Sequence, residues 1–114
     1  MEESILTSTK AMLGLTEDYT PFDQQIMMCI NTALNALTQV GIGDKNGFTI
    51  HDASATWSDW YGDDIRMEAA KTAVYIRTRL LFDPPANVTM EQSLKDQLAE
   101  IEWRLQSTIN HPEV

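Results

Sequence analysis

The side chains most able to do chemistry are acidic and lie near the middle of the chain. They are Asp52, Asp59, Asp63 and Asp64, and His51 directly precedes the first of them. Clustered carboxylates can bind a hard cation, but this spacing matches no calcium-binding loop. No His-x-x-x-His pair on a helix accompanies them, since the second histidine, His111, comes near the end of the chain. Acidic residues in such positions commonly cap helices or face solvent, so the sequence predicts no metal site.

Nucleophiles and phosphate-binding loops give no stronger signal. Cys29 is the only cysteine, and with a distant histidine it could serve as a nucleophile. It stands between Met28 and Ile30, however, in a helical stretch where a small buried hydrophobic residue is expected. The glycine-rich stretch 41–47 lacks the preceding strand of a dinucleotide site, and no predicted cleft gathers carboxylates for acid–base catalysis. The sequence therefore predicts neither an enzyme nor a bound cofactor.

The charge balance excludes several kinds of partner. Seventeen Asp plus Glu face eight Lys plus Arg, which gives a net charge of −9. Such a chain lacks the cations that displace counterions from nucleic acid, and anionic membranes repel it. Its apolar runs fall short of the ~20 residues of a membrane span, and Met1-Glu2-Glu3 is unlike the start of a signal peptide. We therefore expect synthesis in the cytoplasm, no membrane partner and no sequence-specific DNA binding.

Hydrophobic periodicity predicts a single all-α domain over residues 1–114. Apolar residues make up 43% of the chain, as in globular proteins, and they recur at helical spacing in four stretches. We expect these helices at residues 4–13, 20–40, 63–82 and 89–108. Gly14 is the predicted C-cap of the first helix, Thr20 and Pro21 start the second, and Thr89 with Gln92 forms a capping box for the fourth. Four amphipathic helices on short connections form a small bundle.

An aromatic connector, residues 52–62, joins the second and third predicted helices. It holds Trp57, Trp60 and Tyr61 within five residues. Two interpretations stay open for these rings. They complete the core, with the indole N–H groups bonded to loop carbonyls, or they anchor an interface, because Trp and Tyr dominate binding hot spots.

Small side chains on the third predicted helix permit another helix to approach closely. They are Ala69, Ala70 and Ala73. Together with the three rings of the connector, they form the predicted contact surface with another subunit or a partner.

The end of the chain is short, mixed in character and interrupted by a proline. It consists of Ile109, Asn110, His111, Pro112, Glu113 and Val114. Little apolar surface is available there for packing, so we expect a loose tail from about residue 107.

Several stretches, in their order along the chain, resemble a known family. In the first half they are Ser4-Ile-Leu-Thr-Ser, Phe22-Asp23, Leu37-Thr-Gln-Val-Gly41-Ile-Gly and Gly47-Phe48-Thr-Ile. In the second half they are Thr56-Trp57-Ser-Asp, Ala73-Val-Tyr75-Ile, Leu80-Leu-Phe-Asp-Pro-Pro85 and Glu100-Ile-Glu-Trp103-Arg-Leu105. Over about residues 4–106 the chain resembles the head–tail connector (adaptor) proteins of tailed bacteriophages, a family often labelled phage DNA packaging protein.

The resemblance implies a structural role without enzymatic activity. Members are small α-helical proteins that form a ring, typically dodecameric, beneath the portal of the DNA-filled head. The ring extends the DNA channel, helps to retain DNA and docks a stopper or tail-completion protein, and the C-terminal region tends to reach into the portal ring. The implied location is the head–tail junction of the virion, after synthesis in the bacterial host cytoplasm. A negative chain suits a channel through which DNA slides without sticking.

A second function class stays open, that of a small acidic protein-binding module such as an inhibitor that mimics the charge of DNA. A mimic needs carboxylates aligned on one face. The acids of this chain are dispersed instead, with seven in residues 1–57 and ten in residues 58–114. A large cyclic species in solution would favour the ring, and a monomer or dimer would favour the mimic.

Overall fold

The structure is a computed structural model that describes residues 4–42, 47–61 and 66–110, with side chains up to Gln106. Helices supply the regular structure of these ranges: α1 (Ile5–Met12), α2 (Asp23–Gln39), α3 (Trp57–Tyr61), α4 (Met67–Phe82) and α5 (Val88–Asn110). The described ranges contain no strand, and one isolated antiparallel bridge joins Ser4 to Thr56. The predicted all-α bundle is confirmed, and α3 is a short helix within the aromatic connector.

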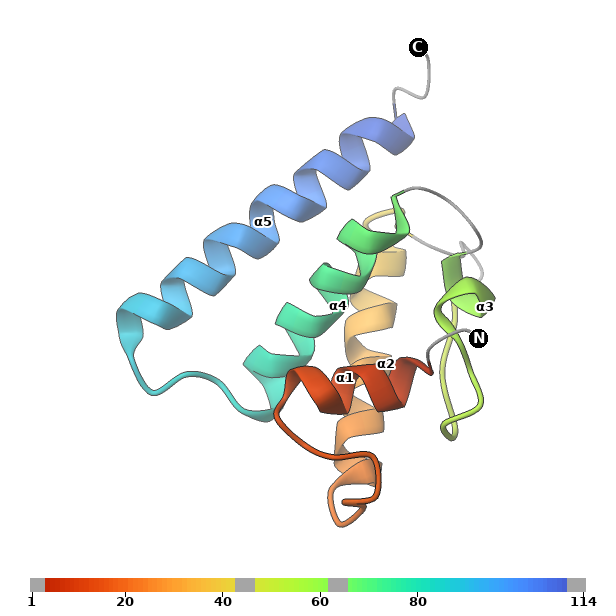
Figure 1. The fold of residues 1–114 in the computed structure, drawn as a ribbon. Helices are drawn as coiled ribbons and strands as arrows, with labels where there is room; N and C mark the ends of the chain where they lie inside the picture. The colour runs from red at the N-terminus through yellow and green to blue at the C-terminus, as the bar shows by residue number, and fades with distance from the viewer. Residues whose placement is uncertain (1–3, 43–46, 62–65, 111–114) are drawn as a thin grey trace.

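α4 is the central helix of the bundle. α2 packs along one side of it and α5 along another, while α1 contacts α2 and α3 contacts α4. Figure 1 shows α5 at the outer edge of the molecule, with α4 between it and α2. One side of α5 is therefore packed on α4, and its opposite side is exposed.

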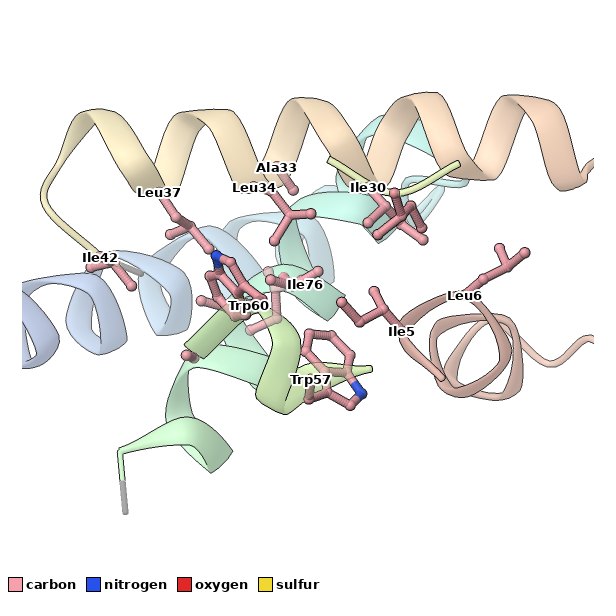
Figure 2. Close-up of a cluster of buried hydrophobic side chains, with 14 of the residues drawn as sticks. Ile5, Leu6, Ile30, Ala33, Leu34, Leu37, Ile42, Trp57, Trp60 and Ile76 are labelled. Atoms are coloured by element: carbon pink, nitrogen blue, oxygen red, sulfur yellow. The ribbon is translucent and has the colours of Figure 1, made fainter. Parts of the chain in front are cut away.

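The hydrophobic core lies among α1, α2, α3 and α4. Its buried apolar side chains before α5 are Ile5, Leu6, Ile26, Ile30, Ala33, Leu34, Leu37, Ile42, Ile50, Trp57, Trp60, Ala70, Ala73, Val74 and Ile76. Figure 2 shows Trp57 and Trp60 extending from α3 into the cluster that Ile5, Leu37 and Ile76 also enter. The two indoles thus join three main helices in one core.

Two helices end in the same backbone motif, which a glycine makes possible in each. After α1, the N–H of Gly14 donates to the carbonyl of Ala11, and the N–H of Leu15 donates to the carbonyl of Lys10. After α2, the N–H of Gly41 donates to the carbonyl of Thr38, and the N–H of Ile42 donates to the carbonyl of Leu37. These are Schellman motifs, and they need the positive φ of 84° at Gly14 and 89° at Gly41, which other residues avoid. Gly14 has the predicted left-handed conformation and stands directly after Leu13, which is the C-cap of α1.

The N-terminal end of α2 differs from the sequence prediction. The helix begins at Asp23, and the predicted start at Thr20 and Pro21 is a turn in which the N–H of Asp23 donates to the carbonyl of Thr20 at 3.1 Å. The carboxylate of Asp23 lies 2.8 Å from Nζ of Lys10, which also donates to the carbonyl of Glu17 at 2.9 Å. Lys10 is only 2% exposed. This contact between the end of α1 and the start of α2 matches both helix dipoles and outweighs the local capping signal.

The predicted cap of α5 is also wrong. α5 begins directly after Asn87, whose side chain accepts a bond from the N–H of Met90 at 3.0 Å. Thr89 therefore lies inside the helix, because Asn caps a helix at least as well as Thr and stands two positions earlier. α4 is described from Met67 onward, and its predicted start at 63–64 lies outside the described residues.

A single side chain holds the segment before α3 to α2. The amide of Asn31 donates to the carbonyl of Ile50 at 3.0 Å and accepts from the N–H of Ile50 at 2.7 Å. No strand forms at residues 48–50. Asn31 satisfies both backbone groups of Ile50 as a neighbouring strand would have done.

Candidate assembly surfaces

Four of the six side chains predicted to form an interface are buried within the chain itself. They are Trp57, Trp60, Ala70 and Ala73. Each indole is only 3% exposed, whereas Tyr61 and Ala69 are half-buried. Because a buried side chain is not available to a partner, burial favours the core interpretation for these four. Contact through Tyr61 and Ala69 stays a prediction.

The aromatic rings of α3 contact both α1 and α4. Nε1 of Trp57 donates to the hydroxyl of Ser8 at 2.8 Å rather than to a loop carbonyl, and its ring meets Tyr75 edge-on at 5.6 Å between centroids. Nζ of Lys71 lies 5.7 Å from the Trp57 ring, a cation–π contact. Trp60 packs against Trp57 at 6.0 Å. These contacts make α3 part of the scaffold.

Two acidic residues of the connector accept hydrogen bonds that stabilise local turns. Ser54 donates to the carboxylate of Asp52 from its hydroxyl at 2.6 Å and from its N–H at 2.8 Å, and these bonds lower the pKa of Asp52. The carboxylate of Asp59 accepts from the N–H of Thr56 at 2.9 Å, which caps α3. The pair Asp63–Asp64 lies outside the described residues. Within the described ranges, no group of three or more His, Cys, Asp or Glu is arranged to hold a metal ion.

Cys29 is half-buried on α2. Burial raises the pKa of its thiol, so the reactive thiolate is scarcer at neutral pH than in a free cysteine. A catalytic cysteine needs the opposite shift. The environment of Cys29 therefore agrees with its interpretation as a small apolar residue of the helix.

An exposed apolar patch covers the start of α2 and the end of α4. We call it the aromatic patch, and it consists of the exposed Tyr19, Phe22, Met28 and Leu81 and the half-buried Phe82. The ring of Phe22 lies 6.0 Å from that of Tyr19 and meets that of Phe82 edge-on at 5.8 Å. A groove of about 280 Å³ runs beside these rings and is lined by Gln25, Met28, Cys29, Leu81 and Phe82. Contiguous apolar surface of this kind is typical of a protein-binding site.

The outer face of α5 exposes a large apolar side chain. Trp103 on this face is 66% exposed. Val88 and Met90 are exposed because they stand at the start of the helix, where Met90 continues the inward side beyond Leu94. Trp103 falls outside the inward stripe formed by Leu94, Leu98, Ile101 and Leu105, and this spacing is the signal that could have singled it out. Neither α5 nor any other described helix combines the length and apolar content needed to cross a membrane.

A smaller hollow lies where α1, α4 and α5 meet, and we call it the three-helix hollow. It has a volume of about 110 Å³. Its lining residues are Thr9, Met12, Leu13, Tyr75, Ile76, Arg79 and Leu94. Arg79 is the only charged residue among them. Sequence reasoning missed this hollow because its walls come from three separate helices.

The predicted tail is only partly described. Ile109 and Asn110 complete α5, which runs two residues beyond its predicted end at 108, and no side chain after Gln106 is described. Residues 111–114 lie outside the described residues. Contact between this tail and a portal stays a prediction.

Comparison with known proteins identifies a family whose model covers all five helices. The family model described as phage connector protein matches residues 5–111, from the start of α1 to just past the end of α5. No curated protein and no solved structure gave a match. The resemblance to head–tail connectors is thereby confirmed. The chain belongs to the phage connector protein family, which has a structural role at the head–tail junction of the virion.

Proposed function

We propose that this chain assembles into a ring, typically dodecameric, beneath the portal of a tailed phage. The ring extends the DNA channel, helps to retain DNA and docks a stopper or tail-completion protein. Membership of the phage connector family over residues 5–111 carries the proposal. In this role the chain supplies contact surfaces and a channel wall and performs no catalysis.

The exposed apolar surfaces support assembly. The aromatic patch spans α2 and α4, whereas Trp103 projects from the outer face of α5. A closed ring of head-to-tail contacts needs two different surfaces on every copy, each complementary to the other. A chain that exposes apolar side chains on separate helices meets the first part of that requirement.

The negative charge supports the passage of DNA and weakens the alternative role of a DNA mimic. A net charge of −9 discourages adhesion of a polyanion to the channel wall. A mimic needs its carboxylates along one face. Acids of this chain lie on four separate segments, as Glu17, Asp52, Glu68 and Asp96 illustrate.

Two further contacts belong to the same proposal. Tyr61 and Ala69, half-buried near the start of α4, are candidate contacts with a neighbouring subunit. Residues 109–114 are the candidate contact with the portal, and the first two of them complete α5, which lies at the outer edge of the bundle (Figure 1). Ordering the residues beyond α5 on contact with the portal would cost about 1–2 kcal/mol per residue of backbone, so contacts repeated around a ring must offset that cost.

Negative-stain imaging of the purified chain mixed with its portal tests the ring directly. We expect annular particles stacked coaxially on the portal ring, and native mass spectrometry should detect a cyclic oligomer. A chain that stays monomeric and leaves the portal bare at micromolar concentration would overturn the proposal.

Removal of residues 111–114 tests the tail separately. We expect an unchanged circular dichroism spectrum and weaker binding to the portal. A chain of equal length that carries Gly-Ser repeats at these positions is the matched control, and it should bind as weakly as the truncated chain. Portal binding at full strength by both variants would remove the tail from the proposal.

A further inference from the structure

The three-helix hollow has the size and walls of a receptor for one aromatic side chain. Met12, Leu13, Ile76 and Leu94 supply apolar walls, and Tyr75 adds an aromatic one. Its volume of about 110 Å³ approaches that of an engineered cavity of ~150 Å³ that takes up benzene. Met12 is 58% exposed, so the hollow opens to solvent on that side. A single ring can enter it, and a whole helix cannot.

Two polar side chains line the hollow, one without a hydrogen bond and the other without a carboxylate partner within the described chain. Thr9 is 0% exposed, and its hydroxyl makes no hydrogen bond there, an arrangement that native proteins rarely leave uncompensated. Nε of Arg79 donates to the carbonyl of Asp83 at 3.3 Å, but no described carboxylate pairs with the guanidinium. An incoming group that carries both a hydroxyl and a carboxylate would satisfy both residues.

The exposed segment between α1 and α2 presents such a group. Tyr19 is 43% exposed, and its phenol combines an aromatic ring with a hydroxyl. Glu17 and Asp18 directly precede it and are exposed as well. Asp18 accepts a bond from the hydroxyl of Thr16 at 2.8 Å, and no cation of the described chain forms an ion pair with it. This segment is therefore complementary in charge to the hollow, whose only charged lining residue is Arg79.

Other exposed apolar side chains of the described chain fit the hollow less well. Trp103 has no hydroxyl, and the two acids nearest to it along the chain are already paired with Arg104 and Arg77. Phe22 also lacks a hydroxyl, and its ring is packed between two others, those of Tyr19 and Phe82, whereas Tyr19 stands at the end of this row with one ring neighbour. Tyr19 is the side chain that brings ring, hydroxyl and unpaired acid together.

We infer that Tyr19 of one copy enters the three-helix hollow of a neighbouring copy, where Glu17 or Asp18 pairs with Arg79. The inference rests on the proposed ring and names the surface that links its subunits. The copy that gives its Tyr19 offers its own hollow to the next, so the contact repeats head to tail until the ring closes. The phenol hydroxyl meets the hydroxyl of Thr9, and the aromatic ring excludes water from the apolar walls.

Two substitutions separate the two halves of the contact. Tyr19→Ala removes the ring that enters and leaves the hollow intact, whereas Met12→Trp fills the hollow and leaves Tyr19 intact. Both positions are exposed, so both variants should keep the circular dichroism spectrum and melting temperature of the parent chain. Each variant alone should associate at least about tenfold more weakly per contact, as measured by sedimentation velocity with and without the portal.

An equal mixture of the two variants gives the sharpest result. The intact Tyr19 of one variant can enter the intact hollow of the other, and the remaining surfaces of that pair are both defective. We therefore expect native mass spectrometry to detect a mixed dimer and no larger species. Gln97→Trp, which introduces the same residue at an exposed position outside both the hollow and the aromatic patch, is the control and should leave ring formation unchanged.

Charge reversal tests the acid–guanidinium pair. Asp18→Arg together with Glu17→Arg should weaken association, and so should Arg79→Glu alone. The chain that carries all three changes should recover association, because the opposite charges again meet across the contact. Tyr19→Phe should lose part of the affinity, since Thr9 then lacks its partner.

The outcomes distinguish this inference from the proposed function. Full rings from Tyr19→Ala or Met12→Trp chains would overturn the inference and leave the ring standing. Full rings that form only from the mixture would also overturn the inference, because a mixed pair has one intact contact and cannot close a ring through Tyr19 and the hollow. If Met12→Trp rings assemble but no longer bind the portal, the occupant is a portal side chain and the inference fails. If the parent chain forms no ring even with the portal, both fall.

Discussion

The bundle of α1 to α4 and the long helix α5 are held in the molecule by different means. Of the buried apolar side chains in the described chain, α5 contributes only Leu98 and Leu105, although it has 23 residues. Leu94 and Ile101 pack against the core while only partly buried. Two polar contacts complete the attachment: the guanidinium of Arg77 binds Glu102 on α5, and Gln106 donates to the carbonyl of Val40 at 3.0 Å. A helix with few shared core residues can open at a lower free energy than the core itself. We therefore expect α5 to detach from the bundle at a lower free energy than the bundle of α1 to α4 needs to unfold.

The largest expected effect comes from the core of the bundle. Trp57→Ala removes an indole that is packed against Tyr75 and bonded to Ser8, and it should lower the free energy of unfolding by about 3–5 kcal/mol. Trp103→Ala on the exposed face of α5 should change it by no more than about 0.5 kcal/mol. Urea unfolding followed by circular dichroism measures both. Similar losses from the two tryptophans would erase the distinction between the regions.

The next effect concerns the ion pair inside the bundle. Lys10→Met should lower the free energy of unfolding by about 2 kcal/mol, less than for a fully buried pair because Asp23 is partly exposed. Hydrogen exchange should speed up in α1 and at the start of α2. The double variant Lys10→Met/Asp23→Leu removes both charges and should recover much of the loss. No recovery would mean that the charges themselves, rather than an unpaired partner, determine the stability.

A smaller effect is expected at the pair that attaches α5. Glu102→Gln should cost about 1 kcal/mol, between the values for exposed and buried pairs, because Arg77 is partly exposed. Faster hydrogen exchange should be confined to α5. Glu100→Gln, which breaks an exposed pair within α5 itself, is the control and should have almost no effect. Faster exchange in α2 as well would show that α5 belongs to the same cooperative unit as the bundle.

The smallest effect is a change in reactivity without a change in stability. Burial raises the pKa of the Cys29 thiol, so its alkylation by iodoacetamide should have a midpoint at higher pH in the folded chain than in urea. At neutral pH the folded chain should therefore react more slowly. Mass spectrometry of the alkylated fraction against pH measures both midpoints. An equal or lower midpoint in the folded chain would mean that the contact between α2 and α4 leaves Cys29 open to water.

The helices were predictable from the sequence because their signals are local. Periodic apolar residues located the four main helices, and Gly14 and Gly41 ended two of them through motifs that only nearby residues build. The starts were less predictable. Thr20 was a plausible cap on local grounds, yet α2 begins where Asp23 meets Lys10 from another helix. Tertiary contacts of this kind have no signature in a short window of sequence.

The candidate surfaces were less accessible to sequence reasoning than the fold. Trp57 and Trp60 carried two interpretations, and only their 3% exposure favours the core over an interface. Trp103 could have been recognised as exposed from its position off the inward stripe of α5. The three-helix hollow could not, since Thr9, Arg79 and the rest of its lining meet only after α1, α4 and α5 have packed.

The attachment of α1 has a consequence for the order in which the chain folds during synthesis. The N–H of Ile5 bonds to the carbonyl of Ala55, and Ser8 accepts from Trp57, so α1 depends on residues made about 50 positions later. At roughly 5–20 residues per second, the ribosome adds them only after several seconds. α1 has eight residues, too few for a stable isolated helix. The first helix to leave the ribosome can pack on α2 and pair Lys10 with Asp23 at an earlier stage, but its contacts with α3 and with the segment before it are completed only at this later one.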